Sequence, residues 1–169
     1  MPLSLHEISV GVMLPKLRML STLLDKAAAH AEAAGIDPAT LVEARLAPDM
    51  YPLSGQIQRV SDAAKFGAAR LAGLTPPAFE DTETTLAQLK ERLAKTIAYL
   101  ESVGPDQVDG REEETVTLTL RDRKVDFTGR SYALKMVLPN FYFHVVTTYD
   151  ILRHQGVEIG KRDYLALVG

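Results

Sequence analysis

Long helical stripes of apolar residues constrain the fold of this chain more than any other feature of its sequence. The first stripe alternates steps of three and four positions, at Val10, Met13, Leu17, Leu20, Leu24, Ala27, Ala31 and Ala34. Because an α-helix makes one turn in about 3.6 residues, these side chains share one face. The stripe therefore predicts a long helix that packs against a core.

Local signals give the expected ends of this helix. Ser4 and Glu7 have the spacing of an N-terminal capping box, and Gly35 is suited to a C-terminal cap. Pro15 removes one backbone hydrogen bond and crowds the preceding turn. We therefore expect the helix to bend or restart at residues 12–14.

Three more long helices are expected farther along the chain. The apolar patterns place them at residues 53–71, 82–102 and 138–156, and a short helix is expected after Asp37. Gly73, Pro76 and Pro77 follow the pattern at 53–71, and Gly104 and Pro105 follow the one at 82–102, which is typical of helix ends.

One segment has the period of a strand instead. Residues 115–120 read T-V-T-L-T-L, a strict alternation rich in β-branched side chains, and a charged turn is expected at residues 121–124. Four long helices and one hairpin predict an all-α protein, an antiparallel four-helix bundle with a small β-hairpin inserted before the last helix. We expect a single domain over residues 1–169.

Composition excludes several classes of function. The 19 Lys and Arg residues against 22 Asp and Glu residues give a net charge of −3, which argues against a nucleic-acid partner. The chain has no Cys, so disulfides and a thiolate nucleophile are excluded. No signal peptide and no run of about 20 apolar residues is found, so a cytoplasmic location without a membrane partner is expected.

Histidines are the strongest candidates for chemistry, although none forms a local metal motif. No two of His6, His30, His144 and His154 have the i, i+3 or i, i+4 spacing of paired metal ligands. His144 shares a helical stripe with apolar residues, which predicts an imidazole in or near the bundle interior. It is either a hydrogen-bonded core histidine or part of a ligand site.

A small polar pocket around His144 is the site that these patterns favour. Its expected ligand-binding residues are His144, Asn140, Gln56, Asp49, Tyr51 and His6. His6 extends the first stripe by one turn and would share the site if the two helices are neighbours. The alternative for Asp49 is that it anchors a loop and caps a helix. No catalytic residue is assigned, because nucleophile elbows and phosphate-binding loops are absent.

Three segments are distinctive in order and spacing: RLAPDMYPLSGQ at 45–56, LPNFYFH at 138–144 and YDILRHQGVEIGKRDYL at 149–165. Together with the four-helix layout they resemble the DinB/YfiT-like superfamily, specifically a branch of unknown function. The resemblance covers the whole chain and implies a homodimer. Function does not follow from it, because one fold hosts many functions.

Many proteins of this superfamily hold a divalent metal through three histidines, two of them spaced H-x-x-x-H. This chain departs from that pattern, because Asn140 precedes His144 by four positions and Thr148 follows it by four. We therefore expect no metal or other cofactor, and a binding or structural role with a small-molecule ligand. The alternative is a metal-dependent thiol transferase or hydrolase of the DinB/YfiT type, with a divalent metal held in part by His144.

Overall fold

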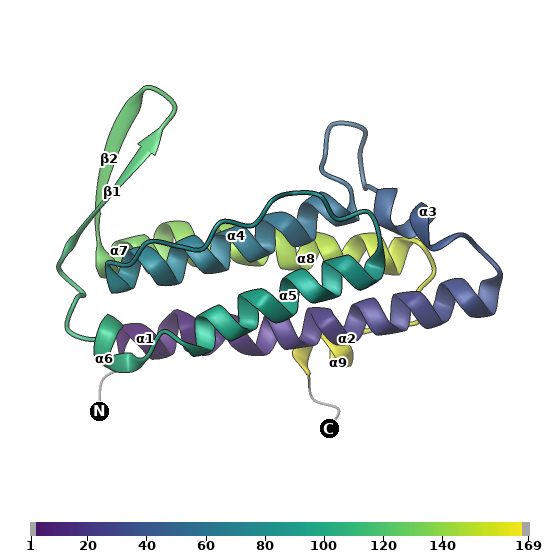
Figure 1. Cartoon of the computed structure of the whole chain (residues 1–169), viewed down its shortest axis with the longest axis horizontal. Coiled ribbons are helices and arrows are strands. Elements are labelled where there is room, and N and C mark those ends of the chain that lie inside the picture. The colour runs from purple at the N-terminus through teal and green to yellow at the C-terminus, as the bar shows by residue number, and fades with distance from the viewer. Residues whose placement is uncertain (1–2, 167–169) are drawn as a thin grey trace.

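Four long helices form the body of the molecule in a computed structural model that describes residues 3–166 (Figure 1). They are α2 (Val10–Ala34), α4 (Leu53–Ala72), α5 (Leu86–Glu101) and α8 (Leu138–His154). Helix α4 packs along both α8 and α5, and α2 packs along α5. The predicted all-α bundle with one hairpin before the last helix is confirmed.

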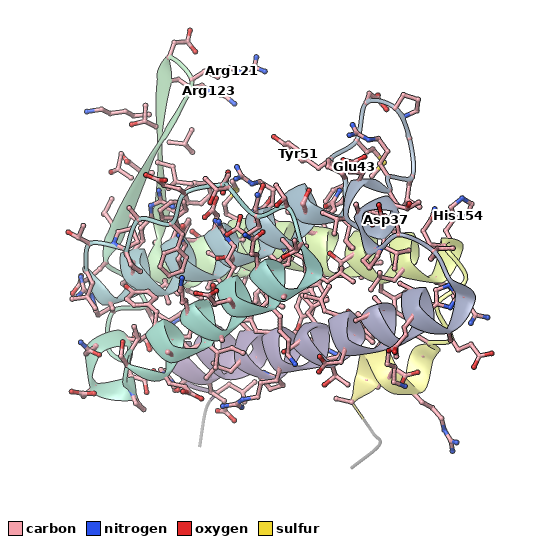
Figure 2. All side chains as sticks on the ribbon, turned by 45° about the vertical axis from the view of Figure 1, so that its right-hand side comes forward. Asp37, Glu43, Tyr51, Arg121, Arg123 and His154 are labelled. Atoms are coloured by element: carbon pink, nitrogen blue, oxygen red, sulfur yellow. The ribbon has the colours of Figure 1, made fainter. Side chains whose placement is uncertain are left out.

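Shorter elements connect and flank these helices. They are α1 (Leu5–Ile8), α3 (Pro38–Glu43), α6 (Pro105–Val108), β1 (Thr115–Leu120), β2 (Arg123–Thr128), α7 (Gly129–Tyr132), the π-helix η1 (Ala133–Val137) and α9 (Lys161–Leu165). The strands pair antiparallel from Thr115 opposite Thr128 to Leu120 opposite Arg123. The hairpin projects from the bundle, with Arg121 and Arg123 at its tip (Figures 1 and 2).

The predicted apolar stripe of α2 lies in the core. Seven of its eight positions, from Val10 to Ala31, are at most 2% exposed, whereas Ala34 in the last turn is exposed. Gly35 ends the helix in the left-handed conformation, with φ of 64°, as expected for a glycine cap. None of the helices in residues 3–166 is long and apolar enough to cross a membrane.

The first helix breaks earlier than predicted. The break lies at Ser9, not at residues 12–14, and Pro15 is accommodated inside α2. The Ser9 hydroxyl donates to the Leu5 carbonyl at 2.6 Å, while the Ser9 N–H turns to the His6 carbonyl. This side-chain bond satisfies the backbone at the break, so the chain leaves the helix there.

Two other helix boundaries also differ from the prediction. Helix α5 begins at Leu86, not at residue 82, because Thr85 and Gln88 form a capping box that fixes its first turn. The last helix begins nine residues before Leu138, because α7 and η1 continue directly into α8. Pro139 then lies just after the wider π-helical turn, which accommodates its missing N–H group.

Candidate functional site

His144 is held in one orientation by Gln56 on the facing helix. Its side chain comes from the middle of α8 and is 9% exposed. The His144 Nδ1 atom lies 2.7 Å from Gln56 Oε1, and Gln56 Nε2 donates to the Tyr51 carbonyl at 3.1 Å. Because that second bond fixes the amide orientation, the atom facing His144 is an acceptor, and His144 Nδ1 must carry the hydrogen.

The environment of His144 favours a neutral ring. Burial lowers the pKa of His144 from its ordinary value of 6.5, and the nearby positive charge of Arg59 lowers it further. A neutral ring with its hydrogen on Nδ1 leaves Nε2 as a hydrogen-bond acceptor. Protonation of the His144 ring is harder in the folded protein than in the unfolded chain. The stability that the neutral ring contributes is therefore complete above pH 6.5 and is lost as the pH falls from 6.5 towards the lowered pKa of His144.

A cavity of about 260 Å³ lies between α4, η1 and α8 beside this ring. Helix α4 lines it with Arg59, Phe66 and Arg70, and the opposite wall contains Val137 and His144. We call this space the His144 cavity. It joins an imidazole, two guanidinium groups, the Asp62 carboxylate and an apolar surface, which is typical of a site for a small organic molecule.

Comparisons with known proteins agree with this architecture. The family model described as "Domain of unknown function (DUF1993)" matches residues 5–165. The chain belongs to the DUF1993 family. A crystal structure of a DinB family member protein from Shewanella denitrificans matches with a TM-score of 0.87 and 38% identity, over 95% of this chain and 91% of that chain. No curated protein matches the DUF1993 chain.

The side chains around His144 do not fit the three-histidine metal centre of the wider superfamily. Across the described part of this DUF1993 protein, no group of three or more His, Asp or Glu side chains is placed to hold a metal ion. Gln56 occupies Nδ1 of His144, and the Thr148 hydroxyl donates to the His144 carbonyl at 2.8 Å. No chemical step is therefore assigned to a metal at this position.

Three of the other predicted residues differ in their relation to His144. Asn140 lines the His144 cavity from an exposed position on α8. Tyr51 accepts from Gln56 with its carbonyl and is 55% exposed on the outer surface beside α3 (Figure 2). Its ring centroid lies 5.8 Å from the guanidinium carbon of Arg59. Asp49 is exposed and does not cap α4, which begins after Pro52 without a side-chain cap.

His6 is not brought to His144. It lies in α1, which packs against α6 at one end of the bundle, whereas Gln56 lies in the first turn of α4 at the end beside α3 (Figure 1). The ring atom Nε2 of His6 is hydrogen-bonded to the Val103 carbonyl at 3.0 Å. The backbone N–H of His6 donates to Asp109 Oδ1 at 2.8 Å. In the structure His6 connects α1 to the segment that contains α6.

A buried ionic network next to the cavity was not predicted from the sequence. The Lys65 and Arg92 side chains are each 1% exposed, and both contact Asp62 Oδ1 at 3.2 Å. Arg92 also bonds to Glu83 at 3.0 Å. The bond between Arg92 and Asp62 joins α5 to α4, and the bond to Glu83 fastens the extended segment 74–85 to α5 (Figure 1).

The sequence did contain a signal for the charged wall of the cavity. Arg59, Phe66 and Arg70 follow one another at steps of seven and four, which places them on one face of α4. A search restricted to apolar stripes does not detect this face. Its Arg residues are recognised as functional candidates only when α8 is seen to bring His144 opposite them.

Proposed function

We propose that this DUF1993 protein binds a small organic molecule in the His144 cavity, through a hydrogen bond that the molecule donates to His144 Nε2. One observation carries the proposal: Gln56 occupies Nδ1, so the second ring nitrogen is the acceptor that remains for a ligand. A hydrogen bond that a ligand donates to this nitrogen contributes about 0.5–1.5 kcal/mol to binding.

The walls of the cavity support a ligand with an apolar body. Phe66, Met136 and Val137 line the cavity between its polar residues. Burial of apolar surface supplies affinity, whereas the few polar groups orient the molecule. A short aliphatic diol satisfies both requirements and serves as a neutral probe.

Titration with hexane-1,6-diol tests the proposal. We expect the NMR signals of the His144 ring and of Val137 to move in a saturable manner. Replacing His144 with Phe keeps an aromatic ring but removes the acceptor, and we expect it to weaken binding by up to about tenfold. His154→Phe, in the exposed last turn of the same helix, is the matched control and should bind the diol like the wild type. Equal binding by the wild type and His144→Phe would refute the proposal.

The homodimer implied by the family resemblance stays a prediction. Phe143 and Val146 are 57% and 41% exposed, and their spacing of three places them on one face of α8. Exposed apolar groups on one helix face are a suitable contact for a second copy. Light scattering should give twice the chain mass of 18.5 kDa.

Phe143→Glu should return the particle to the mass of one chain, because it would bury a charge in the contact. Leu46→Glu, at a 41% exposed position between α3 and α4, is the control and should leave the mass unchanged. A wild-type mass of a single chain would show that this face has no such role.

A further inference from the structure

One arginine of the His144 cavity is not balanced by a carboxylate. Arg59 pairs with Asp62 at 3.1 Å and also with Asp81. Arg70 forms no ion pair with the described residues, and its Nη1 atom donates instead to the Tyr132 hydroxyl at 3.0 Å. The charge of Arg70 is therefore available to an anion.

Arg70 and His144 lie towards opposite ends of the cavity. Arg59 and Arg70 are eleven positions apart on α4, which is roughly 16 Å along the helix axis at about 1.5 Å per residue. Arg59 acts electrostatically on His144, whereas Arg70 bonds to Tyr132 at the start of α7–η1–α8. Phe66 and Val137 line the space with them. The cavity thus has Arg70 at one end, an apolar middle, and at the other end the His144 acceptor beside the ion pair of Arg59 and Asp62.

The charges at each end select different ligand groups. At the Arg70 end, the Tyr132 hydroxyl accepts from Arg70 and keeps its own hydrogen for donation, so the pair offers donors to one carboxylate. A phosphate dianion would call for more than this one unbalanced cation. At the other end, Arg59 is already paired with Asp62 and Asp81, and the ligand group required is a donor to His144 Nε2, for which a neutral hydroxyl is suitable.

We infer that the ligand is a small aliphatic carboxylic acid with a hydroxyl group at its far end, the carboxylate lying at Arg70 and Tyr132 and the hydroxyl at His144. This inference rests on the proposed function and adds the chemical class of the ligand. It assigns a specificity role to Arg70, an exposed residue that pairs with no carboxylate within residues 3–166.

A comparison of 6-hydroxyhexanoate with hexane-1,6-diol tests the inference, because the two probes share the hydroxyl and the apolar chain. The acid should bind at least about tenfold more tightly, as expected for a charged hydrogen-bonded pair. Arg70→Gln should abolish that preference and leave the affinity for the diol unchanged. Arg130→Gln, an exposed arginine outside the cavity, is the control and should keep the preference.

The outcomes separate this inference from the proposed function. If the diol and the acid bind equally well to the wild type, or if Arg70→Gln still prefers the acid, the acidic ligand class is wrong although the cavity binds small molecules. If neither probe moves the His144 signals, the proposed function itself fails and the inference fails with it. Unchanged diol binding in Arg70→Gln also shows that this variant is folded.

Discussion

Replacing Asp62 with Asn is expected to lower the free energy of unfolding by about 3 kcal/mol. The Asp62 carboxylate is shared by Lys65 and Arg92, whose side chains are almost completely buried. Removal of one partner from a buried ion pair leaves a buried charge without compensation. Breaking a buried ion pair usually costs about 3–5 kcal/mol. We expect a value at the lower end because the Asp62 side chain is itself 20% exposed.

Lys65 carries most of this cost. Burial already lowers the pKa of Lys65, and Asp62 is the main group that opposes this shift. Without that carboxylate, the partners of Lys65 Nζ among the described residues are the Pro77 carbonyl at 3.2 Å and the rings of Phe66 and Phe79, none of which carries a negative charge. Arg92 is affected less, because Glu83 and Asp81 still contact it.

Urea unfolding followed by circular dichroism measures the change. Asp25→Asn is the matched control, since it breaks an ion pair with Lys90 in which both side chains are about half exposed. Exposed pairs contribute at most about 1 kcal/mol, so the control should unfold at nearly the wild-type urea concentration. Equal small effects of both substitutions would mean that the Asp62 network does not stabilise the bundle.

Gly67→Ala is expected to destabilise the protein by about 1–3 kcal/mol. A Cβ atom at Gly67 would lie 2.6 Å from Val137 Cγ1, closer than two carbon atoms can pack. Both residues lie where α4 meets η1, so the extra methyl group would push apart the helices that form the His144 cavity. Glycine here permits a close approach of two helices.

A double-mutant cycle in thermal unfolding tests this contact. Val137→Ala removes the methyl group that would clash, so Gly67→Ala should cost less in that background. Gly11→Ala is the control, because a Cβ atom there meets only the His6 carbonyl at an ordinary 3.6 Å, and it should stabilise α2 by about 0.5–1 kcal/mol. Additive effects of the two changes at positions 67 and 137 would contradict the assigned contact.

The bundle was predictable because periodic apolar residues report helices directly. The glycine caps at Gly35 and Gly73 also fixed two helix ends correctly, since each lies in the left-handed conformation that favours glycine. The break at Ser9 was less predictable. The Ser9 hydroxyl donates to the Leu5 carbonyl there in place of the helical backbone bond, whereas the sequence drew attention to Pro15. Local competition of this kind leaves no periodic signal.

The candidate site was only partly predictable, for a related reason. Burial of His144 followed from its helical stripe, and Gln56 was found among its expected neighbours. The separation of His6 from His144 depends on where α1 and α4 lie along the bundle, which periodicity does not define. Arg59 and Lys65 reach Asp62 from three positions away on α4, which the sequence spacing contains. Arg92 lies on α5 and also contacts carboxylates of the segment 74–85, so that part of the ionic network depends on tertiary structure.

The protonation of the His144 ring, followed by long-range proton–nitrogen NMR of the labelled full chain from pH 4 to pH 8, is the most direct test. We expect a hydrogen on Nδ1 throughout the neutral range, an unprotonated Nε2, and a pKa of the His144 ring below the ordinary 6.5. A ring that carries its hydrogen on Nε2, or that takes up its second proton above pH 6.5, would contradict this expectation.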